Sequence, residues 1–158
     1  VVFTRAANVY GPGQQLYRII PKALLCARTG QKLSLHGGGH SIRSFIHIED
    51  VARATRQLAL QAPAGESYHL STWHTVSIRQ LVEQICVLSG VAFQALAEVS
   101  ADRLGKDQAY LLDSSKIREE LDWADQISLQ DGLKETLQWM DDNLKELSQQ
   151  PAEYHHKA

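Results

Sequence analysis

The sequence begins with VVFTRAANV (residues 1–9), which is followed by Tyr10 and then by a Gly11-Pro12-Gly13 turn. An apolar, β-branched run of this kind is typical of a buried strand, and a glycine–proline turn is a strong strand terminator. Chains seldom begin inside a buried strand unless a partner covers its edges. We therefore expect residues 1–9 to form a buried strand that does not fit the rest of the lobe, and we expect the chain to form a homo-oligomer through this strand.

The remainder of the chain predicts one lobe of mixed strands and helices. Strands are expected over residues 33–36, 44–48, 67–71 and 93–99, and helices over residues 19–27, 49–61, 78–88, 115–121 and from 129 onward. Ser77 and Gln80 form a capping box. No internal repeat is visible. We expect an α/β (α+β-like) fold, with a single lobe over residues 1–147 and a polar tail over residues 148–158.

Composition excludes several classes of function. Sixteen basic and eighteen acidic side chains give a net charge of −2, so no broad basic surface for nucleic acid is expected. The apolar runs are too short to span a bilayer, and no signal-peptide pattern opens the sequence. Cys26 and Cys86 both lie in apolar helical patterns, which favours two buried free thiols over a disulfide. We expect a cytoplasmic protein.

Common cofactor and metal motifs do not account for the polar clusters. Gly37-Gly38-Gly39 predicts a turn, because no Gly-x-Gly-x-x-Gly opens a helix after a strand and no Gly-Lys-Ser/Thr ends a phosphate loop. His36, His40 and His47 have no cysteine pattern near them that completes a metal site, and we expect none. His69 and Ser71 lack an acid that could orient a base, so no nucleophile pair is expected.

Arginine and asparagine side chains instead point to an anionic ligand. Arg43 follows the glycine-rich turn, and Arg103 lies between two carboxylates in DRLGKD (residues 102–107). Asn8 ends the first strand, and α/β proteins bind ligands beyond the carboxyl ends of parallel strands. Guanidinium groups offer phosphate oxygens a planar fork. A surface salt bridge is the alternative for each arginine taken alone.

An ordered series of motifs carries a resemblance to a known family. The series comprises RAANVYGP (5–12), IPK (20–22), RSFIHIEDVA (43–52), GESYHL (65–70), DRLGKD (102–107) and DSSKI (113–117). It resembles the C-terminal half of extended short-chain dehydrogenase/reductases, and most closely nucleotide-sugar 4,6-dehydratases of the dTDP-glucose type. The resemblance extends from residue 1 to about residue 144. It implies the substrate-binding part of an NAD-dependent epimerase/dehydratase fold, lacking most of the Rossmann domain.

The resemblance also implies a set of substrate-binding residues. Asn8 would hold the diphosphate–sugar end of the ligand, and Arg43 with Arg103 would clamp the diphosphate. Arg18 would lie near the nucleotide, while Ile19 and Pro21 pack beside the base. His36 stands where the family carries an aromatic ring on the base. Lys106 replaces a histidine of the dTDP-glucose enzymes. The expected set is therefore Asn8, Arg18, Ile19, Pro21, His36, Arg43, Arg103 and Lys106.

Catalysis is not expected from these 158 residues alone. The family oxidises a sugar carbon with NAD through a Tyr-x-x-x-Lys pair, whereas Tyr154 and Lys157 are three positions apart in a polar tail. The resemblance thus implies a chain that binds a nucleoside diphosphate sugar, binds no cofactor by itself, and has a possible N-terminal cofactor-domain partner. Two alternatives stay open: a non-catalytic module that self-associates through strand 1–9, or part of a nucleotide-sugar epimerase.

Overall fold

The structure is a computed structural model and describes residues 1–101 and 107–153. Its strands are β1 (Phe3–Ala6), β2 (Asn8–Tyr10), β3 (Leu33–His36), β4 (Ile42–Arg43), β5 (Phe45–His47), β6 (Ser67–Leu70), β7 (Val76–Ser77), β8 (Ala97–Ser100) and β9 (Ala109–Tyr110). Its helices are α1 (Ile19–Thr29), α2 (Ile48–Gln61), α3 (Ile78–Ser89), α4 (Phe93–Leu96), α5 (Ser115–Leu121), α6 (Leu129–Asp142) and α7 (Leu144–Leu147), with a 3-10 turn over Gly37–Gly39. The expected α/β class is confirmed.

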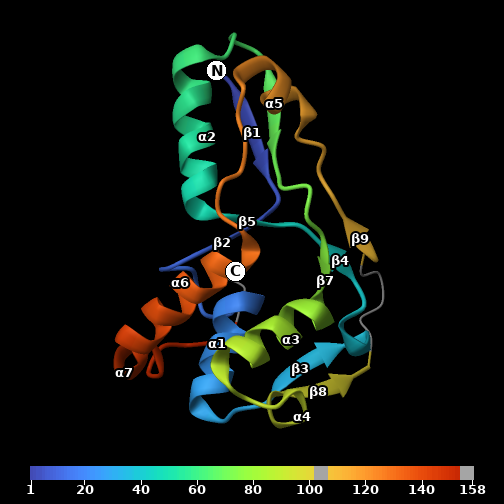
Figure 1. Cartoon of the computed structure of the whole chain (residues 1–158), viewed down its shortest axis with the longest axis vertical. Helices are drawn as coiled ribbons and strands as arrows, with labels where there is room; N and C mark the ends of the chain where they lie inside the picture. The colour runs from blue at the N-terminus through green and yellow to red at the C-terminus, as the bar shows by residue number, and fades with distance from the viewer. Residues whose placement is uncertain (102–106, 154–158) are drawn as a thin grey trace, which may run out of the picture.

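Two hydrophobic clusters form the core. The large cluster, which includes Leu24, Leu81 and Met140, lies among α1, α3 and α6 and beside the β3–β8 pair. The small cluster, which includes Leu58 and Tyr68, lies between α2, α5 and the β1–β6 pair. Figure 1 shows the two groups of elements one above the other, with β2 and β5 between them. The strand pairs β1–β6, β2–β5 and β3–β8 are all parallel.

A buried carboxylate and a close approach between α6 and β2 connect the elements around the two clusters. Asp50 of α2 is fully buried, and its carboxylate accepts hydrogen bonds from the backbone N–H groups of Gln126 (3.0 Å) and Ile127 (3.1 Å). It therefore fixes the loop that leads into α6. Gly132 of α6 lies against the phenol oxygen of Tyr10, where a Cβ atom would overlap that oxygen. A glycine here allows α6 to approach β2 closely, at the helix-propensity cost that glycine carries.

Serine side chains cap two of the helices, α3 and α6. Ser77 and Gln80 form the predicted capping box at α3, with the Ser77 hydroxyl accepting from the Gln80 N–H at 3.1 Å. Ser128 caps α6 by accepting from the N–H of Asp131 at 3.1 Å. Ser114 precedes α5 without a capping bond: its hydroxyl donates to the Ser71 carbonyl and accepts from Nε of Arg118, both at 3.1 Å. Both cysteines are free and buried, as expected.

Two strand predictions are wrong. Residues 1–9 form no single buried strand: the chain bends at Ala7, leaves its pairing with β6, and continues as β2 beside β5. β1 is largely exposed, with Phe3 at 57%. Residues 93–96, predicted as strand, form the short helix α4, and only 97–100 are extended. Leu96 is buried in the large cluster, and Phe93 packs against that cluster, so the apolar residues of this segment indicated burial but did not decide between strand and helix.

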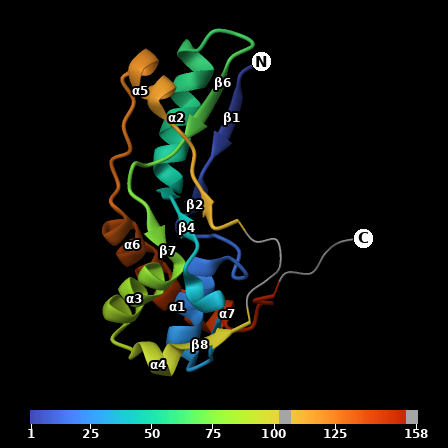
Figure 2. The ribbon, with the colours of Figure 1, turned by 90° about the vertical axis from the view of Figure 1, so that its right-hand side faces the viewer.

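None of the helices in the described ranges has the length and apolarity needed to cross a bilayer. In Figure 2, seen from the side, β1 lies next to β6 with its other edge turned outward. Among residues 1–101 and 107–153, β6 is the partner of β1 in the sheet.

Candidate functional site

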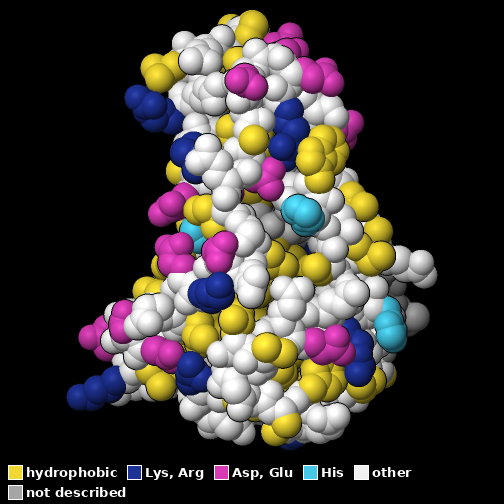
Figure 3. Space-filling model, in the orientation of Figure 1, with side chains coloured by type: hydrophobic (Ala, Val, Ile, Leu, Met, Phe, Trp, Pro, Cys, Tyr) yellow, Lys and Arg dark blue, Asp and Glu magenta, His cyan; other side chains and the backbone are white. Residues whose placement is uncertain are grey.

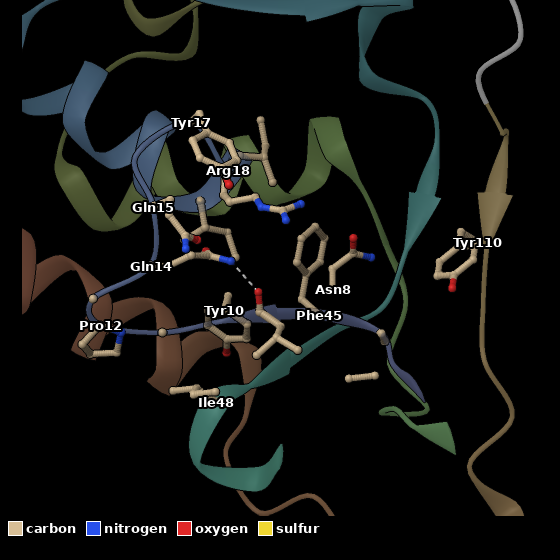
Figure 4. A pocket seen from close by; sticks show the side chains of 17 residues that line it. Asn8, Tyr10, Pro12, Gln14, Gln15, Tyr17, Arg18, Phe45, Ile48 and Tyr110 are labelled. Carbon is tan, nitrogen blue, oxygen red and sulfur yellow. Dashed lines mark hydrogen bonds between the residues drawn. The ribbon is translucent and has the colours of Figure 1, made fainter. Parts of the chain in front are cut away.

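A pocket of about 1050 Å³ opens where β2 ends. Residues 6–15 and 17–20 form most of its wall, and Phe45, Ile48 and Tyr110 complete it. Figure 4 shows these side chains around one opening, drawn from β2, the loop before α1, β5 and β9. The pocket thus lies beyond the carboxyl end of a parallel strand, where α/β proteins bind ligands.

The loop between β2 and α1 is shaped by one glycine and one glutamine. Gly11 has a φ of +148°, and a Cβ at this position would lie 2.6 Å from Cγ2 of Ile48. Only glycine therefore lets the chain pass so close to the start of α2. Gln14 then folds back, and its Nε2 donates to the Val9 carbonyl at 2.6 Å (Figure 4). These two contacts fix the path of the loop along the pocket wall.

Asn8 supplies an oriented amide to the pocket. Its Nδ2 donates to the Ser44 carbonyl at 3.0 Å, and the same carbonyl accepts from the Asn8 backbone N–H at 3.2 Å. Both bonds connect β2 to the residue before β5. The side chain is therefore held in one orientation before any ligand arrives.

Arg18 supplies positive charge. Its guanidinium carbon lies 5.4 Å from the centre of the Tyr17 ring, a distance that suits a cation–π contact. The side chain is exposed and points toward the middle of the pocket in Figure 4. Among the residues that the structure describes, no carboxylate lies within ion-pair distance of it. A guanidinium without a carboxylate partner in a pocket favours an anionic ligand.

Tyr10 lies in the pocket wall as a neutral group. Its ring is buried, and its hydroxyl lies 3.4 Å from the carbonyl oxygens of Ser128 and Leu129. Burial, followed by the negative charges of Asp50, Glu135 and Asp131, raises the pKa of Tyr10 above its ordinary value. Tyr10 therefore stays protonated at neutral pH and contributes packing at the base of the pocket.

The residues expected from the sequence fall into three groups. Asn8, Arg18 and Ile19 line the pocket together. Pro21, His36 and Arg43 do not line it. Pro21 is buried in α1, and Nδ1 of His36 lies 2.9 Å from the Ser100 hydroxyl. The Arg43 guanidinium donates to the carbonyls of Ile42 (2.7 Å) and Asp107 (2.8 Å). Arg103 and Lys106 lie outside the described residues.

Sequence reasoning missed several wall residues. Gln14, Gln15 and Tyr17 follow the Gly11-Pro12-Gly13 turn, and their place directly after a strand end was the available signal. Phe45 reads in the sequence as a strand residue of the core. Tyr110 is 100 positions away from β2 and carried no signal, because only the pairing of β4 with β9 brings it here.

A second pocket of about 440 Å³ lies on the opposite side of Phe45, between the loops 72–76 and 125–129. Its two carboxylates are already engaged: Asp50 with Arg53 and the 126–127 backbone, and Asp125 with Arg118. Figure 3 shows that polar, charged and apolar side chains are mixed over the face of the molecule seen in Figure 1. The described residues contain no cluster of three or more side chains able to hold a metal ion.

Comparison with known proteins places the chain in a family. A family model described as GDP-mannose 4,6 dehydratase matches residues 1–136. The dTDP-glucose 4,6-dehydratase of Streptomyces niveus is 37% identical over 143 residues, which cover 90% of this chain and 42% of that protein.

Solved structures agree with this match. The dTDP-glucose 4,6-dehydratase of Bacillus anthracis, in complex with NAD, is 32% identical with a TM-score of 0.86, and the match covers 92% of this chain and 46% of that one. The UDP-glucose 4-epimerase of Thermotoga maritima, with UDP-glucose, is 26% identical with a TM-score of 0.83, covering 90% and 46%. The chain thus spans less than half the length of these three relatives. Because the family model covers residues 1–136 of 158, the chain belongs to the GDP-mannose 4,6 dehydratase family of nucleotide-sugar dehydratases and epimerases.

Proposed function

We propose that this chain binds the nucleoside diphosphate sugar of an NAD-dependent nucleotide-sugar 4,6-dehydratase. One observation carries the proposal: the Arg18 guanidinium points into a pocket at the carboxyl end of β2, without a carboxylate partner among the described residues. The pyrophosphate of such a ligand is negatively charged, and its oxygens can accept hydrogen bonds from the Arg18 guanidinium. The oriented amide of Asn8 lies in the same pocket and supplies a hydrogen-bonding group for the sugar end.

The other expected residues remain part of the proposal. Arg43 uses two of its N–H groups on backbone carbonyls, and a guanidinium carries five, so it keeps donors for a phosphate. Arg103 is its proposed partner in the clamp. Ile19 and Pro21 would pack beside the base, with His36 stacking on it and Lys106 near the phosphates.

We propose that this chain does not hold NAD by itself. Dinucleotide binding needs a glycine-rich turn that leads from a strand directly into a helix. The turn after β2 has glycines at 11 and 13, but α1 begins only at Ile19, and the sequence has no Gly-x-Gly-x-x-Gly. NAD and a cofactor domain on the N-terminal side of the whole protein are part of the proposal, as is a cytoplasmic location.

Calorimetry with dTDP, UDP and GDP tests the proposal. We expect at least one of them to bind the chain, and Arg18→Gln to weaken that binding about tenfold or more, because a hydrogen bond to a charged group is lost. Arg56→Gln removes an exposed arginine of α2 outside the pocket and serves as the control. The absence of heat from all three nucleotides at millimolar concentration would refute the proposal.

The exposed edge of β1 favours a second candidate. Val1 is 87% and Phe3 57% exposed, and β1 has one strand partner among the described residues. An open strand edge with apolar side chains is a template for pairing with another chain. A non-catalytic module that self-associates through residues 1–9 is therefore the alternative, and similarity to an epimerase structure keeps a nucleotide-sugar epimerase as a third.

A further inference from the structure

His47, the last residue of β5, is buried without a hydrogen bond to either ring nitrogen. Its side chain is 0% exposed, and neither Nδ1 nor Nε2 has a hydrogen-bond partner among the residues that the structure describes. An unpaired polar atom in a protein interior costs free energy, and native structures contain few of them. The role of this ring must therefore come from the groups packed around it.

The His47 ring lies directly behind the loop that forms the pocket wall. A Cβ atom at Gly11 would lie 3.1 Å from Nε2 of His47 and 2.6 Å from Cγ2 of Ile48, so Gly11 packs closely against both side chains. Gly11 is also the first residue after β2, and it lines the pocket. A displacement of the imidazole ring would therefore move the start of the pocket loop.

Helix α6 contacts the β2–β5 pair at two points one turn apart. Gly132 lies against the phenol oxygen of Tyr10. Tyr10 is the register partner of His47, and the centres of their rings are 5.3 Å apart with an angle of 77° between the planes. One turn further along α6, a carboxylate oxygen of Glu135 lies 3.6 Å from Nε2 of His47. The Glu135 side chain is 47% exposed and does not line the pocket, so it connects the surface of α6 to the ring behind Gly11.

The Glu135 carboxylate acts on the imidazole through the negative charge of its oxygens. A distance of 3.6 Å is too long for a hydrogen bond, but it is within the range of an ion pair. A neutral imidazole carries one N–H, and a negatively charged oxygen favours the tautomer in which that hydrogen faces it. Screening by water is weak at a ring that is fully buried. Glu135 therefore favours a hydrogen on Nε2, the ring nitrogen beside Gly11.

We propose that Glu135 and His47 form a positioning pair that holds Gly11, and with it the β2–α1 loop, in the arrangement that binds the ligand. The inference rests on the proposed function, because it takes the pocket beside Gly11 as the ligand site. Glu135 keeps the ring in one tautomer and one orientation, and the ring supports Gly11. Neither side chain lines the pocket, so the pair changes affinity without touching the ligand.

Calorimetry with UDP, dTDP and GDP compares the wild-type chain with Glu135→Ala and Glu135→Gln. We expect Glu135→Ala to weaken binding about three- to tenfold, the scale of one polar contact in a protein interior. Glu135→Gln keeps a side-chain oxygen that can face Nε2, and it is expected to recover part of the lost affinity. Asp142→Asn is the matched control, because it removes an exposed carboxylate of the same helix outside the pocket, and affinity should stay within about twofold.

Nuclear magnetic resonance reads the pair without any ligand. The nitrogen shifts of an imidazole ring distinguish its two tautomers, and the signals of His47 are identified by their loss in His47→Gln. In Glu135→Ala we expect the His47 ring signals and the Gly11 amide signal to shift. In Asp142→Asn both should stay in place. A role of Glu135 confined to the stability of α6 would not change the tautomer of His47.

Three outcomes would overturn the inference: unchanged affinity in Glu135→Ala, a loss of affinity with unchanged His47 and Gly11 signals, or equal losses in Glu135→Ala and Glu135→Gln. In each case binding by the wild-type chain would leave the proposed function standing. Failure of the wild-type chain to bind any of the three nucleotides would refute the proposed function. The His47 and Gly11 signals alone would then decide whether the pair positions the loop.

Discussion

The two hydrophobic clusters differ in how completely the chain covers them. The large cluster is enclosed by helices from three parts of the sequence, and its central residues Leu24 and Leu81 are fully buried. The small cluster has α2 and α5 around it, but its sheet is two strands wide and leaves β1 exposed. The described residues therefore enclose one core fully and leave the sheet of the other with an open edge. The pocket lies at the junction, where β2 and β5 connect the two.

The largest expected effect of this difference is on the stability lost when a core side chain is shortened. We expect Leu81→Ala, in the large cluster, to lower the free energy of unfolding by about 3–5 kcal/mol, and Leu58→Ala, in the small cluster, by about 2 kcal/mol. Leu81 is 0% and Leu58 1% exposed, but fewer buried side chains surround Leu58 and its sheet has an open edge, so we expect the structure around Leu58 to close more of the cavity. Urea unfolding followed by circular dichroism measures both. Equal losses, or a larger loss for Leu58→Ala, would contradict the contrast.

The ion pair between α1 and α6, two helices around the large cluster, predicts a pH-dependent stability. Arg28 of α1 donates to both carboxylate oxygens of Asp141 in α6, at 2.5 and 2.8 Å, and this pairing lowers the pKa of Asp141. A carboxyl group with a lowered folded-state pKa stabilises the protein above its unfolded pKa of about 4 and loses that contribution as the pH falls through the folded-state pKa.

We therefore expect wild type to exceed Asp141→Asn in stability by about 1 kcal/mol at pH 7, a value kept low by solvent screening of the partly exposed pair. The difference should shrink as the pH falls below about 4. Unfolding midpoints across pH 2–7 measure it, with Asp142→Asn as the neighbouring control. A difference that persists unchanged at low pH would show that the ion pair is not its source.

The open edge of the small cluster gives the smallest expected effect on stability. Phe3→Lys should change the free energy of unfolding by less than about 0.5 kcal/mol, because the side chain is mostly exposed. It should abolish any concentration-dependent association, since a lysine on a strand edge opposes pairing with another chain. Sedimentation velocity over a range of concentrations measures this, and Val87→Lys, at an 82% exposed position of α3, is the control.

A wild-type chain that sediments as a monomer at high concentration would remove self-association through β1 as a candidate. Association that Phe3→Lys and Val87→Lys reduce equally would assign it to general surface hydrophobicity instead.

Local signals in the sequence were sufficient for most elements. The capping box at Ser77 and the cap at Ser128 determine where α3 and α6 begin, because a side-chain oxygen satisfies a backbone N–H a few residues away. The family resemblance placed Asn8, Arg18 and Ile19 in one site, and the three do line one pocket.

What the sequence alone determined is therefore the set of contacts that span a few residues, together with the motif order that identifies the family. The tertiary structure decided the break of the first strand at Ala7, the folding of residues 93–96 into α4, and the arrival of Tyr110 at a pocket built by β2. Each depends on pairing between segments that are far apart along the chain. Such pairing is governed by which backbone edge and which cavity remain open once the other elements have packed, and no local pattern of residues records that.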